Sequence, residues 1–312
     1  MDPLDRLLHQ RPDLAPFDPE RAADFRLWRA AKLADYPTSA EALRVEVADP
    51  AALSPAERAA LLARLRKTNL AVYCGPASED PALPRRLAGQ LGLTRWDPNY
   101  LGDEDGISAL TDRAGEAGRY IPYTNRPLQW HTDGYYNPPE RRIRAFLLHC
   151  VRPAAEGGDN GLLDPELVYL LLREADPEHI RALMRPDVLT IPAGKDADGR
   201  PRPAVTGPVF AVDPDGDLTL RYTARRHHVE WRDDGPTRRA RAALEAVLGQ
   251  ADGYGFSLRL EAGMGLVCNN VLHNRAGFRD DPAGPPRLLY RARYRDRVAG
   301  TGLHERRLPG PN

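Results

Sequence analysis

From about residue 120 onward, the sequence alternates short apolar runs with clusters of glycine, proline and aspartate. This pattern limits the chain to folds made of many short strands, because each run has the length of one strand and ends at turn-forming residues. Such spacing is typical of a β-sandwich or jelly roll. We therefore predict a mainly β fold, and the clearest strands cover residues 143–151, 209–212, 218–222, 256–260, 265–268 and 288–294.

Helices are expected to flank these strands. Ser54, Pro55 and Glu57 form a capping-box start, with a proline at the first helical position, and the helix should run to about Lys67. A buried strand over 69–74 follows it. The other predicted elements are a surface helix over 19–34, a short strand over 43–47 and helices over 81–91, 164–174 and 237–248.

The domain organisation follows from the absence of an internal repeat and of an interdomain linker in the sequence. We expect a single domain over residues 1–312, which is within the size range of a barrel with insertions. Within it, residues 1–42 form a helical extension, 43–297 the β core with inserted helices, and 298–312 a tail.

Charge and cysteine content exclude several classes of protein. The 44 basic and 44 acidic residues cancel, so the overall basic excess that favours nucleic acids or anionic membranes is missing. Cys74, Cys150 and Cys268 are far apart, which argues against a disulfide framework or a structural zinc site. Because no apolar run approaches a membrane span and charges fill the first thirty residues, we expect a cytoplasmic protein that acts on a small molecule. A homo-oligomer is left open.

The segment Gln129-Trp130-His131-Thr132-Asp133-Gly134 carries the sharpest chemical signal. Residues two apart in an extended chain point to the same side, so His131 and Asp133 can reach one metal ion. With a second histidine they would form a site of two histidines and one carboxylate, which leaves positions open on iron(II). Alone, a His-x-Asp triplet is more often an ordinary surface turn.

Three further segments are each weak alone. Asn269 to His273 follows a predicted strand, and His273 could be only a hydrogen-bonded histidine. Gly157-Gly158-Asp159-Asn160 is a turn by itself. Arg287 opens the last strand and could be a solvated edge residue. The order of these segments along the chain, rather than any one of them, carries the argument.

In that order, the four segments resemble the taurine dioxygenase superfamily. HTDGYYN (131–137), FLLHCV (146–151), GGDN (157–160), RYTARR (221–226) and NNVLHNRAGF (269–278) look closest to its γ-butyrobetaine and trimethyllysine hydroxylase branch. The resemblance covers roughly residues 43–297. It implies a double-stranded β-helix, a jelly-roll variant of the clavaminate synthase-like type.

The resemblance also implies a cofactor and the residues that hold it. His131, Asp133 and His273 match the Fe(2+) ligands. Arg287 matches the arginine that binds the distal carboxylate of 2-oxoglutarate, the cosubstrate used with O2. Asn160 falls where relatives carry Thr or Ser, so its contact with the same carboxylate is less secure.

Substrate residues are harder to assign. Tyr135 and Tyr136 could form part of an aromatic cage, although strand packing is equally plausible, and Tyr222 is a further candidate. Arg291 should lie on the same face of the last strand as Arg287. If no acidic side chain neutralises Arg291, the missing partner is best explained as an anionic group on the substrate.

The resemblance thus implies a dioxygenase that hydroxylates or oxidatively demethylates a small, anionic or zwitterionic metabolite, with release of succinate and CO2. In a second interpretation, the same scaffold catalyses desaturation or ring chemistry in a biosynthetic pathway. A third is a catalytically silent β-helix that only binds. Substrate-dependent succinate release separates the third reading from the others, and product mass separates the first two.

Overall fold

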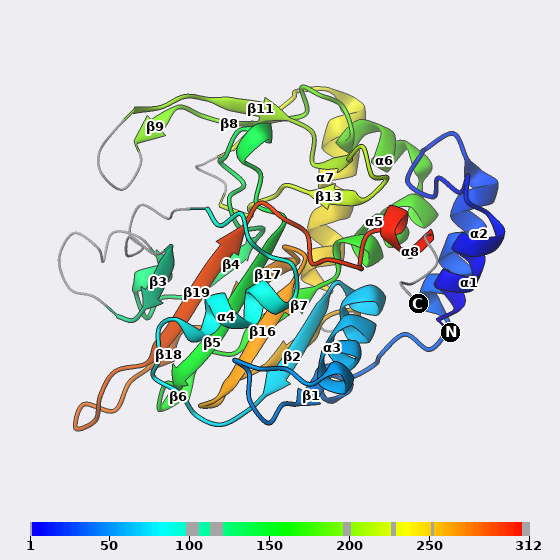
Figure 1. Cartoon of the computed structure of the whole chain (residues 1–312). Helices are drawn as coiled ribbons and strands as arrows, with labels where there is room; N and C mark the ends of the chain where they lie inside the picture. Colours follow the sequence, from blue (N-terminus) through cyan, green and yellow to red (C-terminus); the bar gives the residue numbers. More distant parts are fainter. Residues whose placement is uncertain are drawn as a thin grey trace.

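Two facing β-sheets form the centre of the molecule (Figure 1). The computed structural model describes residues 2–97, 106–112, 121–195, 201–225, 229–250 and 253–307. The larger sheet has six strands in the spatial order β1 (Arg44–Glu46), β2 (Leu70–Cys74), β16 (Met264–Cys268), β5 (Ala145–Arg152), β19 (Leu288–Tyr294) and β3 (Ile107–Leu110). Its pairings are antiparallel except for the parallel pair β1 and β2.

The smaller sheet has four strands in the order β15 (Phe256–Leu258), β7 (Asn160–Leu163), β17 (Leu272–Arg275) and β4 (Leu128–His131). All of its pairings are antiparallel. Together the two sheets are the two walls of a double-stranded β-helix, as the sequence predicted.

Strand β2 shows how the sequence divides the core into layers. Leu70 and Val72 point into the apolar cluster between the two sheets, which also contains Leu162 and Phe256 of the smaller sheet. The alternate residue Tyr73 points outward, into a cluster beneath the helices. A strand that is buried on both faces reads as a continuous apolar run, which is why residues 69–74 could be recognised.

Helices cover the outer faces of both sheets (Figure 1). Against the larger sheet pack α3 (Pro55–Thr68) and α4 (Leu83–Gln90). On the smaller sheet's side lies a helical layer that includes α1 (Pro3–Gln10), α2 (Ala22–Leu33), α5 (Pro165–Ala175), α6 (Pro177–Leu183), α7 (Gly235–Gly249) and α8 (Leu303–Arg307). Single turns of 3-10 helix lie at Ala40–Leu43, Ile121–Tyr123 and Pro139–Arg141.

The segment between α6 and α7 forms a series of short strands. These are β8 (Leu189–Ile191), β9 (Gly194–Lys195), β10 (Pro201–Arg202), β11 (Val205–Gly207), β12 (Phe210–Val212), β13 (Leu218–Leu220) and β14 (Glu230–Trp231). A separate two-residue pair joins β6 (Glu156–Gly157) to β18 (Phe278–Arg279). Of these strands, β12 and β13 correspond to the strands predicted over 209–212 and 218–222, whereas the others are too short and too rich in polar residues to stand out in the sequence.

The sequence-predicted elements agree closely with the structure. Ser54 caps α3, with the reciprocal Glu57 contact of a capping box, and the strand predicted over 288–294 is found with the same bounds. The helices α1, α6 and α8 were not predicted individually. The helix predicted at the surface over 19–34 is α2, but one side of it is deeply buried, and Trp28 is fully covered.

The helical layer is fastened to the smaller sheet by a buried ion cluster. Lys32 on α2 donates to the carboxylates of Asp164 (2.7 Å) and Glu166 (2.6 Å) at the start of α5, and its side chain is only 1% exposed. Buried charges are tolerated when they are paired, but removing one partner leaves the others uncompensated. Lys32 therefore holds residues 1–42 to the core.

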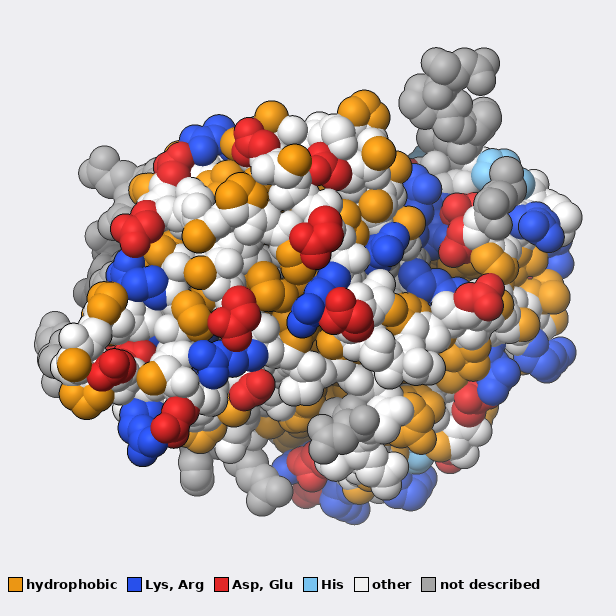
Figure 2. Space-filling model, turned by 90° about the horizontal axis from the view of Figure 1, so that it is seen from below, with side chains coloured by type: hydrophobic (Ala, Val, Ile, Leu, Met, Phe, Trp, Pro, Cys, Tyr) orange, Lys and Arg blue, Asp and Glu red, His pale blue; other side chains and the backbone are white. Residues whose placement is uncertain are grey.

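Acidic and basic side chains are interspersed over the face that Figure 2 shows. This is the surface that a chain with no net charge is expected to present. No helix among the described residues is long and apolar enough to cross a membrane.

We predict that Lys32→Ala lowers the free energy of unfolding by about 3–5 kcal/mol, because it removes the cation nearest to two buried carboxylates and leaves only the more distant Arg297, 4.0 Å from Glu166. Urea denaturation measures the change. Arg29→Ala on the same helix is the control, since Arg29 pairs with Glu174 at the surface, and its loss should be below about 1 kcal/mol. Equal losses in the two variants would contradict a special role for Lys32.

Candidate metal centre

Two neighbouring strands bring His131 and His273 together. His131 ends β4 and lies directly opposite His273 on β17, so both side chains leave the sheet on one face. Their ring centroids are 4.1 Å apart. Asp133 follows two residues after His131, and the candidate ligand atoms of all three residues lie within 4.8 Å of one another. All three side chains are buried.

The backbone fixes which nitrogen of each imidazole is free. The Nδ1 atom of His131 lies 2.9 Å from the carbonyl oxygen of Gln129, and Nδ1 of His273 lies 3.0 Å from that of Val271. A carbonyl oxygen only accepts, so each Nδ1 carries the proton and donates it. Each Nε2 is therefore left with a lone pair, which is the form that coordinates a metal.

Burial and nearby charges set the ionisation of the three groups. Burial, with the neighbouring His273, lowers the pKa of His131 to about 3. Burial also lowers the pKa of His273. For Asp133, burial opposes ionisation, but the positive charges of Arg291 and Arg293 outweigh it and hold the pKa well below its usual range. At neutral pH the site therefore offers two neutral imidazoles and one carboxylate.

Only one carboxylate oxygen of Asp133 accepts a hydrogen bond from the described part of the chain. Oδ1 accepts from Arg291 Nη1 at 3.2 Å, whereas the buried Oδ2 has no hydrogen-bond partner among the described residues. A buried carboxylate oxygen without a partner is costly unless something else binds it. Together with the two Nε2 atoms, Oδ2 gives a donor set that suits a divalent transition metal.

The pairing of Arg291 corrects an expectation from the sequence. Arg291 does lie on the inner face of β19, together with Leu289 and Arg293. However, it is paired with Asp133, so the argument that an unpaired Arg291 requires an anionic substrate is wrong. The sequence could not show this pair, because it joins a turn after β4 to a strand of the opposite sheet.

Arg287 lies immediately before the start of β19, and its side chain has no acidic partner among the described residues. It is 4% exposed, its Nη1 has no hydrogen-bond partner in that part of the chain, and its guanidinium stacks 4.9 Å from the ring centroid of Phe278. Asn160 lines the same small cavity, together with Gly158 and Arg259. The structure thus brings Arg287 and Asn160 together, as the sequence predicted.

The three tyrosines differ in their surroundings. Tyr136 accepts a hydrogen bond from Arg293 at 3.1 Å, and its ring meets that of Tyr135 edge to face. Burial raises the pKa of the Tyr135 hydroxyl, which lies near Arg225. Tyr222 packs into the apolar cluster on the outer side of the smaller sheet, close to Trp231. Packing therefore accounts for Tyr222, which was a substrate candidate in the sequence.

The profile of the family described as taurine catabolism dioxygenase TauD, TfdA family matches residues 30–293. The chain belongs to this family. The predictions of superfamily, fold, a dioxygenase, and iron with 2-oxoglutarate are confirmed at the level of the TauD/TfdA family. The predicted nearness to the betaine hydroxylase branch stays a prediction.

Two curated relatives of this TauD/TfdA chain are each named uridine-5'-phosphate dioxygenase. The protein from Amycolatopsis sp is 36% identical over 173 residues, which are 53% of this chain and 60% of that protein. The protein from Streptomyces sp is 35% identical over 199 residues, 61% of this chain and 69% of that protein. The chain thus spans about three fifths to two thirds of the relatives' length.

A solved asparagine oxygenase, in complex with Fe(II), 3-hydroxyasparagine and succinate, shares the fold of this TauD/TfdA chain. Its TM-score is 0.57 at 18% identity, and the match covers 94% of this chain and 89% of that one. At this identity the likeness extends to the fold alone.

His149 and Cys150 of this TauD/TfdA chain are buried in β5, and the Nδ1 atom of His149 is 2.9 Å from the Tyr73 hydroxyl, so both belong to the core. The sequence did not reveal the roles of Asn270 and Asp97, because both act through contacts with distant segments. Asn270 holds the turn at Asp133, and Asp97 pairs with Arg293.

A larger cavity of about 510 Å³ lies on the opposite face of the smaller sheet. Trp130 and Asn274, the strand neighbours of the two histidines, line it. Since neighbouring strand residues point to opposite faces, this hollow is behind the histidines, away from the convergence of Nε2 and carboxylate atoms. We therefore place the chemistry between the sheets.

The turn after Asp133 can accept only glycine without strain. Gly134 has φ +66°, and an added Cβ would lie 2.4 Å from Cγ1 of Ile143. We predict that Gly134→Ala lowers the free energy of unfolding by about 2–4 kcal/mol, from backbone strain and a steric clash together. Thermal or urea unfolding measures this.

The control is Gly216→Ala, because Gly216 has φ +84° but nothing within 4 Å of the added Cβ. It should lose only the strain, about 1–2 kcal/mol. If Gly134→Ala lowered the free energy of unfolding no more than Gly216→Ala, the contact with Ile143 would not contribute to the requirement for glycine in this turn.

Proposed function

We propose that the chain is an Fe(II)- and 2-oxoglutarate-dependent dioxygenase whose iron is held by His131, Asp133 and His273. The observation that carries the proposal is the convergence of two Nε2 lone pairs and one unpartnered carboxylate oxygen in a buried site. Two histidines and one carboxylate on one face leave open positions for a cosubstrate and O2. A silent binding protein has no need of such a donor set.

The protein's own residues would have three tasks in this reaction. When bound, the iron would supply the activation of O2 that drives oxidation of the substrate. The carbonyls of Gln129 and Val271 hold the imidazoles in the coordinating tautomer, and Arg291 balances the charge of Asp133. Burial between the two sheets keeps bulk water away from the reacting groups.

Arg287 is proposed to bind the distal carboxylate of 2-oxoglutarate. A guanidinium that is buried without an acidic partner in the described chain has a matching anion as its natural ligand. Burial lowers the pKa of Arg287, and a bound carboxylate would restore the balance. Asn160 lines the same cavity, but its Nδ2 donates to the carbonyls of Gly158 (3.4 Å) and Leu258 (3.5 Å), so it would have to exchange one of these long contacts to reach that carboxylate.

We propose a small anionic metabolite as the substrate, with uridine 5'-phosphate as the first candidate. The names of the two relatives support this choice. The earlier argument from an unpaired Arg291 no longer supports it, because Arg291 is paired with Asp133. We propose Arg225 as the contact for the anion. It follows Thr223, which bridges to His131, and its guanidinium lies near the Tyr135 hydroxyl. Hydroxylation is preferred, and desaturation or ring chemistry is the alternative.

A substrate panel tests this function. Iron-loaded protein with 2-oxoglutarate is offered uridine 5'-phosphate, uridine, taurine, asparagine and a betaine, and succinate formation is measured. We expect succinate to form fastest with uridine 5'-phosphate and more slowly with uridine, because uridine lacks the anion. Asp133→Ala supplies the background. Equal rates with the nucleotide and the nucleoside would contradict the anionic requirement, and product mass separates hydroxylation from desaturation.

Arg287→Ala should raise the KM for 2-oxoglutarate much more than the KM for the substrate. Truncating one partner of a buried charge pair costs about 2–5 kcal/mol, which corresponds to a loss of affinity of at least about 30-fold. Arg259→Ala is the matched control. Arg259 lines the same cavity, but its Nε already has Glu261 at 3.2 Å, so a small change is expected. The reverse result would assign the carboxylate to Arg259.

A further inference from the structure

Asp133 lies beyond the last hydrogen-bonded residue of β4, so the strand ladder does not fix its position. One side chain takes over that task. Oδ1 of Asn270 accepts from the Asp133 backbone N–H at 2.8 Å, and Nδ2 of Asn270 donates to the Asp133 carbonyl at 3.0 Å. The same Nδ2 donates to the carbonyl of Ile143 at 2.8 Å. Both backbone groups of Asp133 are thus held by one amide.

These two hydrogen bonds to the backbone of Asp133 take the place of those that a neighbouring strand would make. A carboxamide offers one acceptor and two donors side by side, and here all three are used on backbone groups. The preceding residue, Thr132, is fixed separately. Its N–H donates to the carbonyl of Tyr222 at 3.0 Å, and its Oγ1 accepts from the N–H of Tyr222 at 3.2 Å. The turn is therefore held between two segments of the chain.

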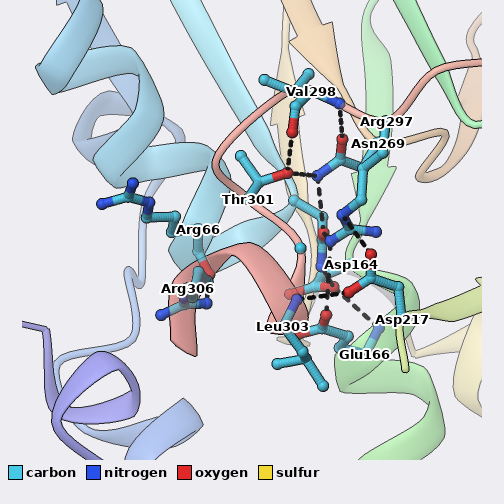
Figure 3. Close-up of polar contacts among 12 residues, drawn as sticks. Arg66, Asp164, Glu166, Asp217, Asn269, Arg297, Val298, Thr301, Leu303 and Arg306 are labelled. Atoms are coloured by element: carbon cyan, nitrogen blue, oxygen red, sulfur yellow. Dashed lines mark hydrogen bonds and ion pairs between the residues drawn. The ribbon is translucent and has the colours of Figure 1, made fainter. Parts of the chain in front are cut away.

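Asn270 is itself held firmly in place. It adopts φ +48°, a left-handed conformation that asparagine tolerates better than most residues. Its neighbour Asn269 is anchored on three sides, as Figure 3 shows in part. Asn269 Nδ2 donates to Asn69 Oδ1 and to Thr301 Oγ1, each at 3.1 Å, and its Oδ1 accepts from the N–H of Val298 at 3.1 Å. The backbone just before Asn270 therefore has little freedom.

We propose that Asn270 is a positioning residue of the metal centre, which sets the location of the Asp133 carboxylate relative to His131 and His273. The proposal rests on the assignment of Asp133 as a metal ligand. Asn270 itself touches neither metal nor substrate; it acts through the backbone of Asp133. Without it, the carboxylate would no longer be aimed at the point where the two Nε2 atoms converge.

Direct metal binding tests the proposal without enzyme turnover. Metal-free protein is titrated with Co(II) at low temperature, where every variant is folded, and the Kd and the visible spectrum are recorded. We expect Asn270→Ala to weaken Co(II) binding by about 10- to 100-fold and to alter the spectrum, as loss of a supporting contact around a ligand does. An Asn270→Ala protein that is folded and binds Co(II) like the wild type would overturn the proposal.

Two other variants separate positioning from general stability. Asn270→Gly accepts φ +48° without strain and removes the same three hydrogen bonds, so it should show the same loss even if the alanine variant folds poorly. Gln90→Ala is the matched control. The Gln90 amide also bonds three backbone groups, because it accepts from the N–H of Leu53 (2.6 Å) and donates to the carbonyls of Pro50 (3.1 Å) and Arg86 (3.2 Å), but it does so at the end of α4 and not at the Asp133 turn.

Gln90→Ala should lower the melting temperature and leave the Kd for Co(II) within about threefold of the wild type, far from the 10- to 100-fold loss of a supporting contact. If it lost as much affinity as Asn270→Ala, stability rather than the contacts to Asp133 would govern the site. Asp133→Ala checks the underlying assignment. If that variant binds Co(II) like the wild type, the proposed metal site fails, whereas a failure of the Asn270 variants alone refutes only the positioning role.

Discussion

The register between β4 and β17 is the constraint on which the centre depends. It places His131 directly opposite His273, and both imidazoles then donate backward to carbonyls of their own strands. A slip of one residue would turn one ring to the outer face, toward the cavity lined by Trp130 and Asn274. The closely packed apolar residues between the sheets make such a slip costly, so the hydrophobic core also sets the geometry of the chemistry.

The second organising feature is a set of three buried arginines, of which Arg287 immediately precedes β19 and Arg291 and Arg293 lie on its inner face. The charge of each buried guanidinium is balanced in a different way. Arg291 is paired with Asp133, and Arg293 with the almost fully buried Asp97. Arg287 alone among these three has no acidic partner in the described chain, which is the difference expected of a residue whose counterion is a ligand. One strand and the residue before it thus supply the charge balance of the ligand set and the candidate cosubstrate contact.

Much of this arrangement could be predicted from the sequence. Strand β19, the capping box of α3 and the convergence of His131, Asp133 and His273 all follow from local patterns and motif order. The partners of these residues could not be predicted. Nothing near Arg291 in the sequence points to Asp133, nothing near Asp133 points to Asn270, and the lysine on α2 gives no sign of the carboxylates that bury it. Contacts between distant segments depend on the completed fold, and only the structure reveals them.

The distance between the two histidines along the chain has a consequence for the order of events during folding. His131 and His273 come from strands separated by most of the β core, so the entropy of closing that long loop must be overcome before they meet. Until then an ion would find only the isolated His131 and Asp133. Unlike a zinc finger, whose ligands lie close in sequence and whose metal directs folding, this barrel must assemble first. An ion held by the proposed ligands would then add its binding free energy to a structure that hydrophobic packing has already completed.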